Sequence, residues 1–184
     1  MTEDKQRWNE RYLENPMPNT VSKILEKYVS HAKIGEALDV ACGMGRNTHF
    51  LADLGFCVDA VDISDYALSK VKNSATINKI DADLDKYNLT PNKYDLIVNT
   101  NYLNRRLVSQ MKEALHVGGI VIFETYIVAH GDFQMPTTNL DYLLRKNELL
   151  HSFIGLDIIY YEEKIDTNLD SKKVKIASIV AKKS

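Results

Sequence analysis

Hydrophobic residues along this chain gather in short runs, and between the runs they recur at helical spacing. The runs lie at 37–40, 57–61, 76–80, 94–98 and 120–123. A run as apolar as 94–98 is typical of a strand covered on both faces. Because such runs alternate with helical segments, the pattern predicts a parallel sheet with right-handed crossovers.

Helices are predicted before the first run and after every run except 76–80. The expected helices cover about 3–14, 21–29, 46–54, 64–71, 107–115 and 143–153. Pro16 and Pro18 separate the first two, since proline cannot continue a helix. Ser64 is expected to cap the fourth helix, and Gly118 with Gly119 to close the fifth.

The end of the chain follows a different pattern. Residues 126–140 have no clear period, and loops of that length are usually functional or mobile. The apolar segments 155–163 and 173–181 are separated by a polar turn too short for a parallel crossover, so they predict an antiparallel hairpin. We therefore expect an α/β fold with helices on both faces of a mostly parallel sheet. It would form a single domain over 1–184, with a helical N-terminal cover at about 1–33.

Candidate chemistry lies directly after the first strand. The chain passes through Ala41 into a loop with Gly43 and Gly45, and the next strand ends on Asp62. Glycines let the backbone approach a ligand closely, and the acid after the second strand can accept hydrogen bonds from both ribose hydroxyls. Pairs of glycines also serve as plain turns, so the loop alone predicts a nucleotide-like ligand without saying which.

Composition narrows the possible functions. A chain of 184 residues with 45% hydrophobic content can bury a good core without disulfides. The formal net charge of −2 gives no broad basic surface, so no nucleic-acid partner is expected. Cys42 and Cys57 lie in or beside predicted strands, which favours a reduced, cytoplasmic protein. We expect no membrane span, no signal peptide and, for want of a Cys/His cluster, no metal.

Several segments occur together in an order and spacing that are more specific than any one of them. They are 8–12, 38–47, 58–64, 82–84, 94–97, 102–105, 118–126, 142–144 and 148–150. With these segments the chain resembles, over nearly its whole length, the small class I S-adenosylmethionine-dependent methyltransferases of the tellurite-resistance type. The resemblance implies a Rossmann-like class I methyltransferase sheet and S-adenosyl-L-methionine as the cofactor.

The resemblance also implies a row of cofactor contacts. Gly43 and Gly45 would lie under the methionine part of the cofactor. Asp39 would order that loop or bind the ammonium group; alternatively it only caps the end of its strand. Asp62, with Ile63 beside it, would take the ribose hydroxyls; alternatively it caps the next helix.

The adenine end is assigned to the third strand. Asp83 would accept a hydrogen bond from the adenine amino group while the backbone of Leu84 reads the ring edge, with Asp81 as the rival acid. Asn99, at the end of the fourth strand, is counted among the cofactor contacts. Ala41 stands where the wider superfamily usually has its first glycine, and its small methyl group should be tolerated.

The methyl acceptor is expected over the ends of the fourth and fifth strands, where Glu124, Arg105 and Tyr126 are the candidate catalytic residues. Glu124 would act as a base, or only as a structural hydrogen-bonding group. Arg46 would neutralise the cofactor carboxylate or an anionic acceptor; otherwise it is a solvated residue at the start of a helix. The acceptor itself would be small: a metabolite, a thiol or a metalloid oxyanion.

Other functions share parts of this pattern. A nicotinamide-dependent oxidoreductase would use the same glycine loop and Asp62, but the terminal hairpin counts against it. A non-catalytic binding protein with a methyltransferase fold is the other alternative, and the intact acids count against it. Trp8 and Tyr12, one turn apart, either staple the first helix to the body or close it over the site. We expect a monomer or a homodimer.

Overall fold

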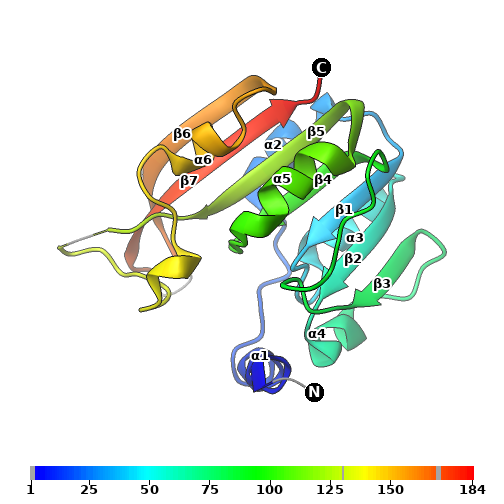
Figure 1. Cartoon of the computed structure of the whole chain (residues 1–184). Coiled ribbons are helices and arrows are strands. Elements are labelled where there is room, and N and C mark those ends of the chain that lie inside the picture. The colour runs from blue at the N-terminus through cyan, green and yellow to red at the C-terminus, as the bar shows by residue number, and fades with distance from the viewer. Residues whose placement is uncertain (1–2, 130, 169–170) are drawn as a thin grey trace.

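The computed structural model describes residues 3–129, 131–168 and 171–184, and its centre is one sheet in the order β3-β2-β1-β4-β5-β7-β6 (Figure 1). The strands are β1 (Glu36–Val40), β2 (Cys57–Asp62), β3 (Ile77–Asp81), β4 (Tyr94–Thr100), β5 (Leu115–Tyr126), β6 (Asp157–Thr167) and β7 (Lys173–Lys182). The first five strands pair in parallel. β7 runs antiparallel between β5 and β6. The predicted parallel sheet with a terminal hairpin is confirmed.

Helices cover both faces of this sheet, as predicted. They are α1 (Glu3–Glu14), α2 (Lys23–Tyr28), α3 (Arg46–Asp53), α4 (Asp65–Lys70), α5 (Arg105–Ala114) and α6 (Glu148–Ser152), with short 3-10 turns at Val29–His31 and Leu140–Tyr142. Among the described residues, no helix is long and apolar enough to cross a membrane.

Two layers of buried side chains hold the helices on the sheet. On one face, Leu107 and Met111 of α5 pack with Ile97 of β4 in a fully buried cluster. On the other face, Leu25 of α2 and Leu51 of α3 pack in a second cluster with the alternate residues of the same strands. This alternation is why the central runs are apolar at every position.

The predicted helix at 143–153 is wrong in its first half. α6 begins only at Glu148; residues 146–147 form a turn, and Leu144 pairs with the chain just after β5. The N–H of Leu144 donates to the carbonyl of Tyr126 (2.9 Å), and the N–H of Val128 donates to the carbonyl of Leu144 (2.8 Å). Pairing with a distant strand end therefore overrides the local helical spacing.

The predicted end of the 107–115 helix also needs correction. α5 stops at Ala114 and β5 begins at the next residue, so Gly118 and Gly119 lie inside a strand. Gly118 has a φ of +86°, and a Cβ on Gly119 would come within 2.9 Å of the carbonyl oxygen of Tyr94. The glycines accommodate a shift of register between β4 and β5 rather than closing a helix.

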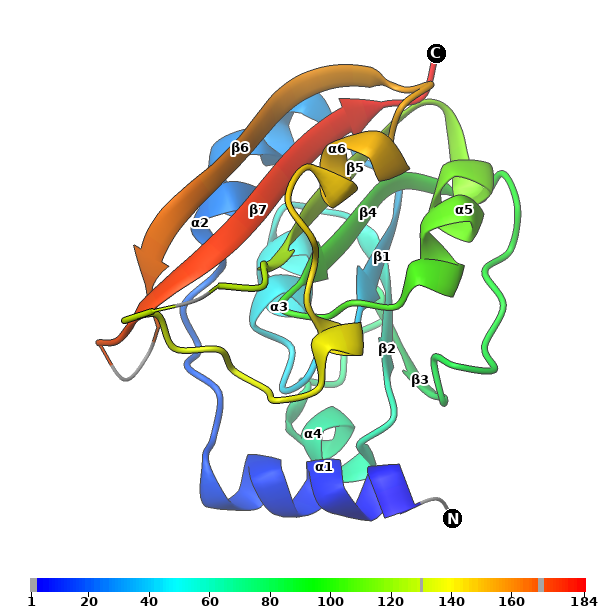
Figure 2. The ribbon, with the colours of Figure 1, turned by 60° about the vertical axis from the view of Figure 1, so that its left-hand side comes forward.

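Parallel strands bring their carboxyl ends to one edge of the sheet, and α1 and α4 lie side by side below that edge (Figure 2). α1 is followed by a connector, residues 15–22, that leads to α2. Ligands of open α/β sheets bind at this edge. The fold therefore places the glycine loop, Asp62 and the ends of β4 and β5 along one edge of the sheet.

Candidate functional site

A small, partly open pocket lies at the carboxyl ends of β1 and β4, between the glycine loop and the connector. Its lining residues are Tyr12, Met17, Pro18, Asp39, Ala41, Cys42, Gly43, Met44, Arg46, Asn47 and Thr100. The pocket brings together residues from α1, the connector, β1, α3 and β4. Several predicted cofactor residues lie in its wall, and so does Tyr12 of the predicted cover.

The backbone of the glycine loop turns through left-handed conformations at three positions. Ala41, Gly43 and Gly45 have φ values of 53°, 54° and 84°. A Cβ on Gly43 would come within 2.9 Å of the Tyr12 hydroxyl, so a glycine is needed there for space as well as conformation. Ala41 adopts the same region with a side chain, which costs roughly 1–2 kcal/mol. The alanine is accommodated, but under backbone strain.

Asp39 is a buried carboxyl group, 2% exposed, beside this loop. Burial raises the pKa of Asp39 to about 6, although a hydrogen bond from Thr48 and the charge of Arg46 oppose the shift. The Thr48 hydroxyl donates to its carboxylate at 2.7 Å. Its partner therefore lies on α3, and Asp39 ties the start of that helix to the end of β1. A cationic ligand group beside this carboxyl would favour its ionised form.

Asp62 connects the loops that follow β1 and β2. Its carboxylate accepts the N–H of Gly43 at 2.8 Å and the N–H of Ser64 at 2.9 Å. Burial raises the pKa of Asp62, while these backbone hydrogen bonds act in the other direction. The Ser64 hydroxyl accepts the N–H of Ala67, so Ser64 caps α4 as predicted. Asp62, with Ile63 next to it, thus shapes the glycine loop, a role that the sequence did not reveal.

The two acids near the end of β3 have different partners. Asp83 accepts the N–H of Asp85 at 3.0 Å and pairs with Lys86 at 3.1 Å. Partial burial of Asp83 opposes these contacts, yet together they hold its pKa below the ordinary value. Asp81 instead pairs with Lys5 of α1 at 2.5 Å. Leu84, which follows Asp83, is buried.

Asn99 is fully buried at the end of β4. Its amide nitrogen donates to the carbonyl of Tyr102 at 2.7 Å. Its side-chain oxygen has no hydrogen-bond partner among the described residues, which is rare for a buried polar atom. Asn99 therefore retains an unused acceptor at the strand end where a ligand is expected.

Arg105 is held away from the pocket. Its guanidinium binds both carboxylate oxygens of Glu148, at 2.5 and 3.1 Å. It also donates to the carbonyls of Asp141 and Leu143, at 2.6 and 2.9 Å. Arg105 lines a separate groove between α5 and α6. Among the described residues, the hydrogen bonds of the Arg105 guanidinium are thus all made to the segment 141–148, which leads into α6.

Glu124 and Tyr126 project from β5 on the face that carries α3. Glu124 lies opposite Thr100 in the parallel register, and the Thr100 hydroxyl accepts a hydrogen bond from Asn47 of α3 at 3.1 Å. Glu124 itself accepts a hydrogen bond from the Ser178 hydroxyl at 2.6 Å. Both predicted residues therefore lie on the same side of the sheet as Asp39 and the pocket.

Arg46 lies close enough to Tyr126 for its positive charge to oppose the rise in the pKa of the Tyr126 hydroxyl. Burial raises the pKa of Tyr126; the charge of Arg46 opposes that shift, and the charge of Glu124 adds to it. Within the described part of the chain, the Arg46 guanidinium has no hydrogen bond or ion pair, and it lines the pocket. It is a cation available to a ligand.

Asn47 is a structural residue of the site that the sequence did not reveal. Its side-chain oxygen accepts the N–H of Ser22 at 3.0 Å and the Ser22 hydroxyl at 3.1 Å, while its amide donates to Thr100. These bonds fix the end of the connector so that Met17 and Pro18 lie over the pocket. The sequence signals only a polar residue in the first turn of a helix, without its partners.

No group of three or more His, Cys, Asp or Glu side chains in the described ranges is arranged to hold a metal ion. The absence of a metal stays a prediction.

Known proteins resemble this chain in sequence. The model of the family described as tellurite resistance protein TehB matches residues 2–179. A probable S-adenosyl-L-methionine-dependent methyltransferase TehB of Haemophilus influenzae is 28% identical over 176 residues, which are 85% of this chain and 59% of that protein. A ribosomal protein L11 methyltransferase of Campylobacter lari is 29% identical over 118 residues, 61% of this chain and 42% of that protein. The chain thus spans less than two thirds of these relatives' lengths.

Solved structures share the fold. TehB from Haemophilus influenzae superimposes with a TM-score of 0.77 at 21% identity, covering 96% of this chain and 67% of that one. Phosphoethanolamine N-methyltransferase 2 of Haemonchus contortus, in complex with S-adenosyl-L-methionine, gives 0.70 at 16% identity, covering 99% and 57%. The sheet order and the terminal hairpin are those of the class I methyltransferase fold, as the resemblance implied.

Proposed function

The chain belongs to the TehB family, and from this premise we propose that it is an S-adenosylmethionine-dependent methyltransferase acting on a small molecule. The observation that carries the proposal is the pocket itself. It lies at the edge of the sheet where open α/β sheets bind ligands. It is lined by the glycine loop, whose backbone is left-handed at three positions, and by the buried carboxyl of Asp39. Asp62 holds that loop in shape from the neighbouring strand.

The residues around the pocket suit the parts of this cofactor. Asp39 would receive the ammonium group, because a cation beside its raised-pKa carboxyl favours the ionised form. Arg46 is a free cation that would pair with the cofactor carboxylate or with an anionic acceptor. Asp62 would accept the ribose hydroxyls with the lone pairs its two backbone donors leave unused.

The remaining assignments extend along the same edge. Asp83, partly buried at the end of β3, would accept from the adenine amino group, with the Leu84 backbone beside it. Asp81 is the weaker candidate because Lys5 already neutralises it. Asn99 would offer its unpaired oxygen to a donor of the ligand.

When bound, the cofactor supplies an activated methyl group on a sulfonium with a good leaving group. The protein then has to position the acceptor and exclude water. Tyr12, Met17 and Pro18 cover the pocket from the connector side and would do the latter. Glu124 would remove a proton from the acceptor where one is needed, with the Ser178 hydroxyl holding its carboxylate in place.

We assign Arg105 a different role from the catalytic one expected. Its guanidinium is occupied by Glu148 and two carbonyls, so it would act by positioning the 140–148 segment beside the acceptor. Tyr126 remains a candidate catalytic residue, because the charges of Arg46 and Glu124 both act on its hydroxyl. The small acceptor, whether a metabolite, a thiol or a metalloid oxyanion, would be enclosed by this segment and by the long loop before it.

Calorimetry with S-adenosylmethionine, S-adenosylhomocysteine and NAD tests the proposal. We expect both sulfur ligands to bind and NAD not to bind. Binding of NAD alone would restore the oxidoreductase hypothesis, and no binding of any of the three at millimolar ligand would remove the enzyme from this class. A screen of small acceptors for release of S-adenosylhomocysteine then identifies the substrate.

A further inference from the structure

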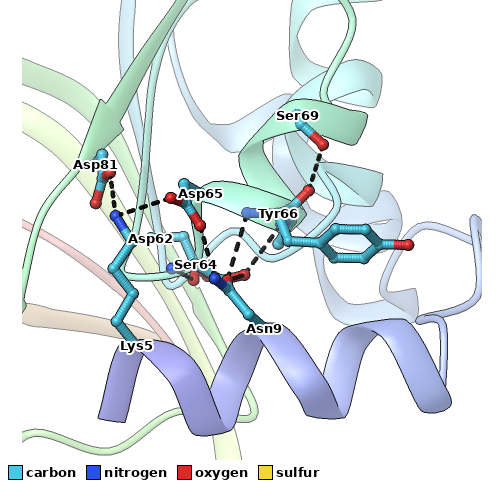
Figure 3. A network of polar contacts seen from close by, with 9 residues as sticks. Lys5, Asn9, Asp62, Ser64, Asp65, Tyr66, Ser69 and Asp81 are labelled. Atoms are coloured by element: carbon cyan, nitrogen blue, oxygen red, sulfur yellow. Dashed lines mark hydrogen bonds and ion pairs between the residues drawn. The ribbon is translucent and has the colours of Figure 1, made fainter. Parts of the chain in front are cut away.

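α1 is attached to the rest of the protein mainly through polar side chains. Of the 12 residues in this helix, only Tyr12 is buried. The side chains of Lys5 and Asn9 point from α1 toward the loop after β2 and the start of α4 (Figure 3). The burial of Tyr12 anchors the last turn of α1, and these polar contacts hold its earlier turns against α4 and the end of β3.

Lys5 joins α1 to the end of β3 and to the start of α4 at once. Its ammonium lies 2.5 Å from the carboxylate of Asp81 and 3.3 Å from that of Asp65. The Lys5 side chain is only 12% exposed, although it belongs to a helix with a solvated outer face. Asp65 and Asp81 together thus bind the ammonium group of one lysine.

Asn9 connects α1 to the acid that would bind ribose. Its amide donates to Asp65 at 2.7 Å, and its side-chain oxygen accepts the Ser64 hydroxyl at 2.6 Å and the N–H of Tyr66 at 3.4 Å. The N–H of Ser64 in turn donates to Asp62. A continuous chain of hydrogen bonds therefore runs from α1 through Ser64 to Asp62 (Figure 3).

The same helix closes the pocket. Tyr12, two turns beyond Lys5, lies against Gly43 of the glycine loop and lines the pocket. With α1 docked, this side of the pocket is shut by a side chain that moves with the helix. An isolated helix of this length is marginal in water, so undocking α1 would also loosen it.

We propose that Lys5 and Asn9 are positioning residues that latch α1 over the cofactor pocket, so that the cofactor enters and leaves only while the latch is open. The inference rests on the proposed function, because it concerns the same pocket. Partly exposed ion pairs and single hydrogen bonds contribute modestly to stability, so such a latch opens often enough for turnover. Salt screens the contacts of Lys5, and the latch opens more readily at high ionic strength.

Stopped-flow fluorescence tests the latch directly. Trp8 is the one tryptophan of the chain and lies in α1, with its ring centroid 5.8 Å from that of Tyr12, so its emission reports on this helix. The probe ligand is S-adenosylhomocysteine, and the variants are Asn9→Ala and Lys5→Ala. Arg7→Ala is the matched control, because among the described residues Arg7 pairs with Asp4 of the same helix alone, on its exposed side.

Opening the latch should accelerate entry and exit together. We expect Asn9→Ala and Lys5→Ala each to raise both the association and the dissociation rate constants about fivefold, with a smaller change in Kd, and Arg7→Ala to change neither. A rise in dissociation alone would mean that the variants merely disturb Asp62, and it would overturn the latch. Unchanged rates in both variants would do the same.

A second readout does not depend on the cofactor. Hydrogen exchange of the α1 amides in the ligand-free protein should be faster in Asn9→Ala than in Arg7→Ala. If neither the wild type nor any variant binds S-adenosylhomocysteine, the proposed function fails. The exchange rates of the α1 amides still test whether Asn9 holds α1 in place. Equal protection of α1 in the two variants would overturn the latch.

Discussion

The glycine loop and the proposed acceptor side of the site are held by hydrogen bonds of different range. On the glycine-loop side, the bond from Thr48 to Asp39 spans 9 positions, and that from Gly43 to Asp62 spans 19. All four residues lie within a single strand–helix–strand unit. Its geometry is therefore set by local chain constraints and by backbone donors whose positions the fold dictates.

The proposed acceptor side is held by long-range contacts between side chains. Arg105 reaches Glu148 across 43 positions, and Ser178 reaches Glu124 across 54. These bonds join α5 to α6 and β5 to β7. The described residues between 127 and 147, which connect β5 to α6, have little regular structure. The conformation of the glycine loop, the frame of the cofactor half, is thus fixed by short-range bonds. The proposed acceptor half depends instead on a few side-chain pairs that sequence divergence can alter separately.

The largest effect is expected from removing the acid that shapes the frame. Asp62→Ala would leave the N–H groups of Gly43 and Ser64 unpaired in a buried place, at about 1–3 kcal/mol each. The melting temperature should fall by roughly 2–4 °C for each kcal/mol lost. Cofactor affinity should fall at least tenfold. Calorimetry and thermal denaturation measure both, with Asp53→Ala at the exposed end of α3 as the control. An unchanged melting temperature would mean that the loop keeps its shape without Asp62.

A pH series examines the frame through its other acid. The folded-state pKa of Asp39, about 6, lies above the value of about 3.9 for an unfolded aspartate. Between these values the folded protein binds more protons, so the contribution of Asp39 to stability falls as pH rises. Relative to Asp39→Asn, the wild type should lose about 1–3 kcal/mol in free energy of unfolding between pH of about 4 and 7. Urea denaturation at both pH values measures the difference, and a constant difference would contradict the raised pKa.

The ionisation of Asp39 should also appear in binding. If its carboxylate receives the cofactor ammonium, affinity should rise about tenfold between pH of about 5 and 7 and then level off. Asp39→Asn should bind weakly with no such rise. A wild-type affinity independent of pH would remove Asp39 from the ammonium site while leaving its bond to Thr48 intact.

The acceptor half is tested through its clamp. Arg105→Ala removes the contacts to Glu148 and to two carbonyls, which should cost about 1–2 kcal/mol after allowing for solvent screening. Limited proteolysis should cut the 140–148 segment faster, while the Kd for the cofactor changes little. Arg145→Ala, in the same segment with an exposed side chain, is the matched control. A loss of cofactor binding as large as that of Asp62→Ala would erase the distinction between the two halves.

This difference in range explains what the sequence could predict. The alternation of strands and helices, the terminal hairpin and the cap on α4 follow from hydrophobic period, connection length and turn chemistry. The family resemblance implies the class I sheet. The non-helical conformation of 143–147 does not follow from any of these, because the pairing of Leu144 with the end of β5 overrides a local helical pattern. Arg105 was expected at the acceptor for a related reason. A sequence shows that an arginine follows a strand end, but not which distant carboxylate will occupy it.

The smallest expected effect concerns the backbone of the frame. Ala41 holds a φ of 53°, where a side chain costs roughly 1–2 kcal/mol, whereas glycine would cost nothing. Glycine also enlarges the conformational freedom of the unfolded chain, which cancels about 0.4–1 kcal/mol of that gain. Ala41→Gly should therefore stabilise the protein by about 0.5–1 kcal/mol, measured by urea denaturation. Ala52→Gly, in the right-handed helix α3, should destabilise it by about 1 kcal/mol. Destabilisation by both glycines would show that the loop does not hold Ala41 in the left-handed region, and that the cofactor half is less rigidly framed than its short contacts indicate.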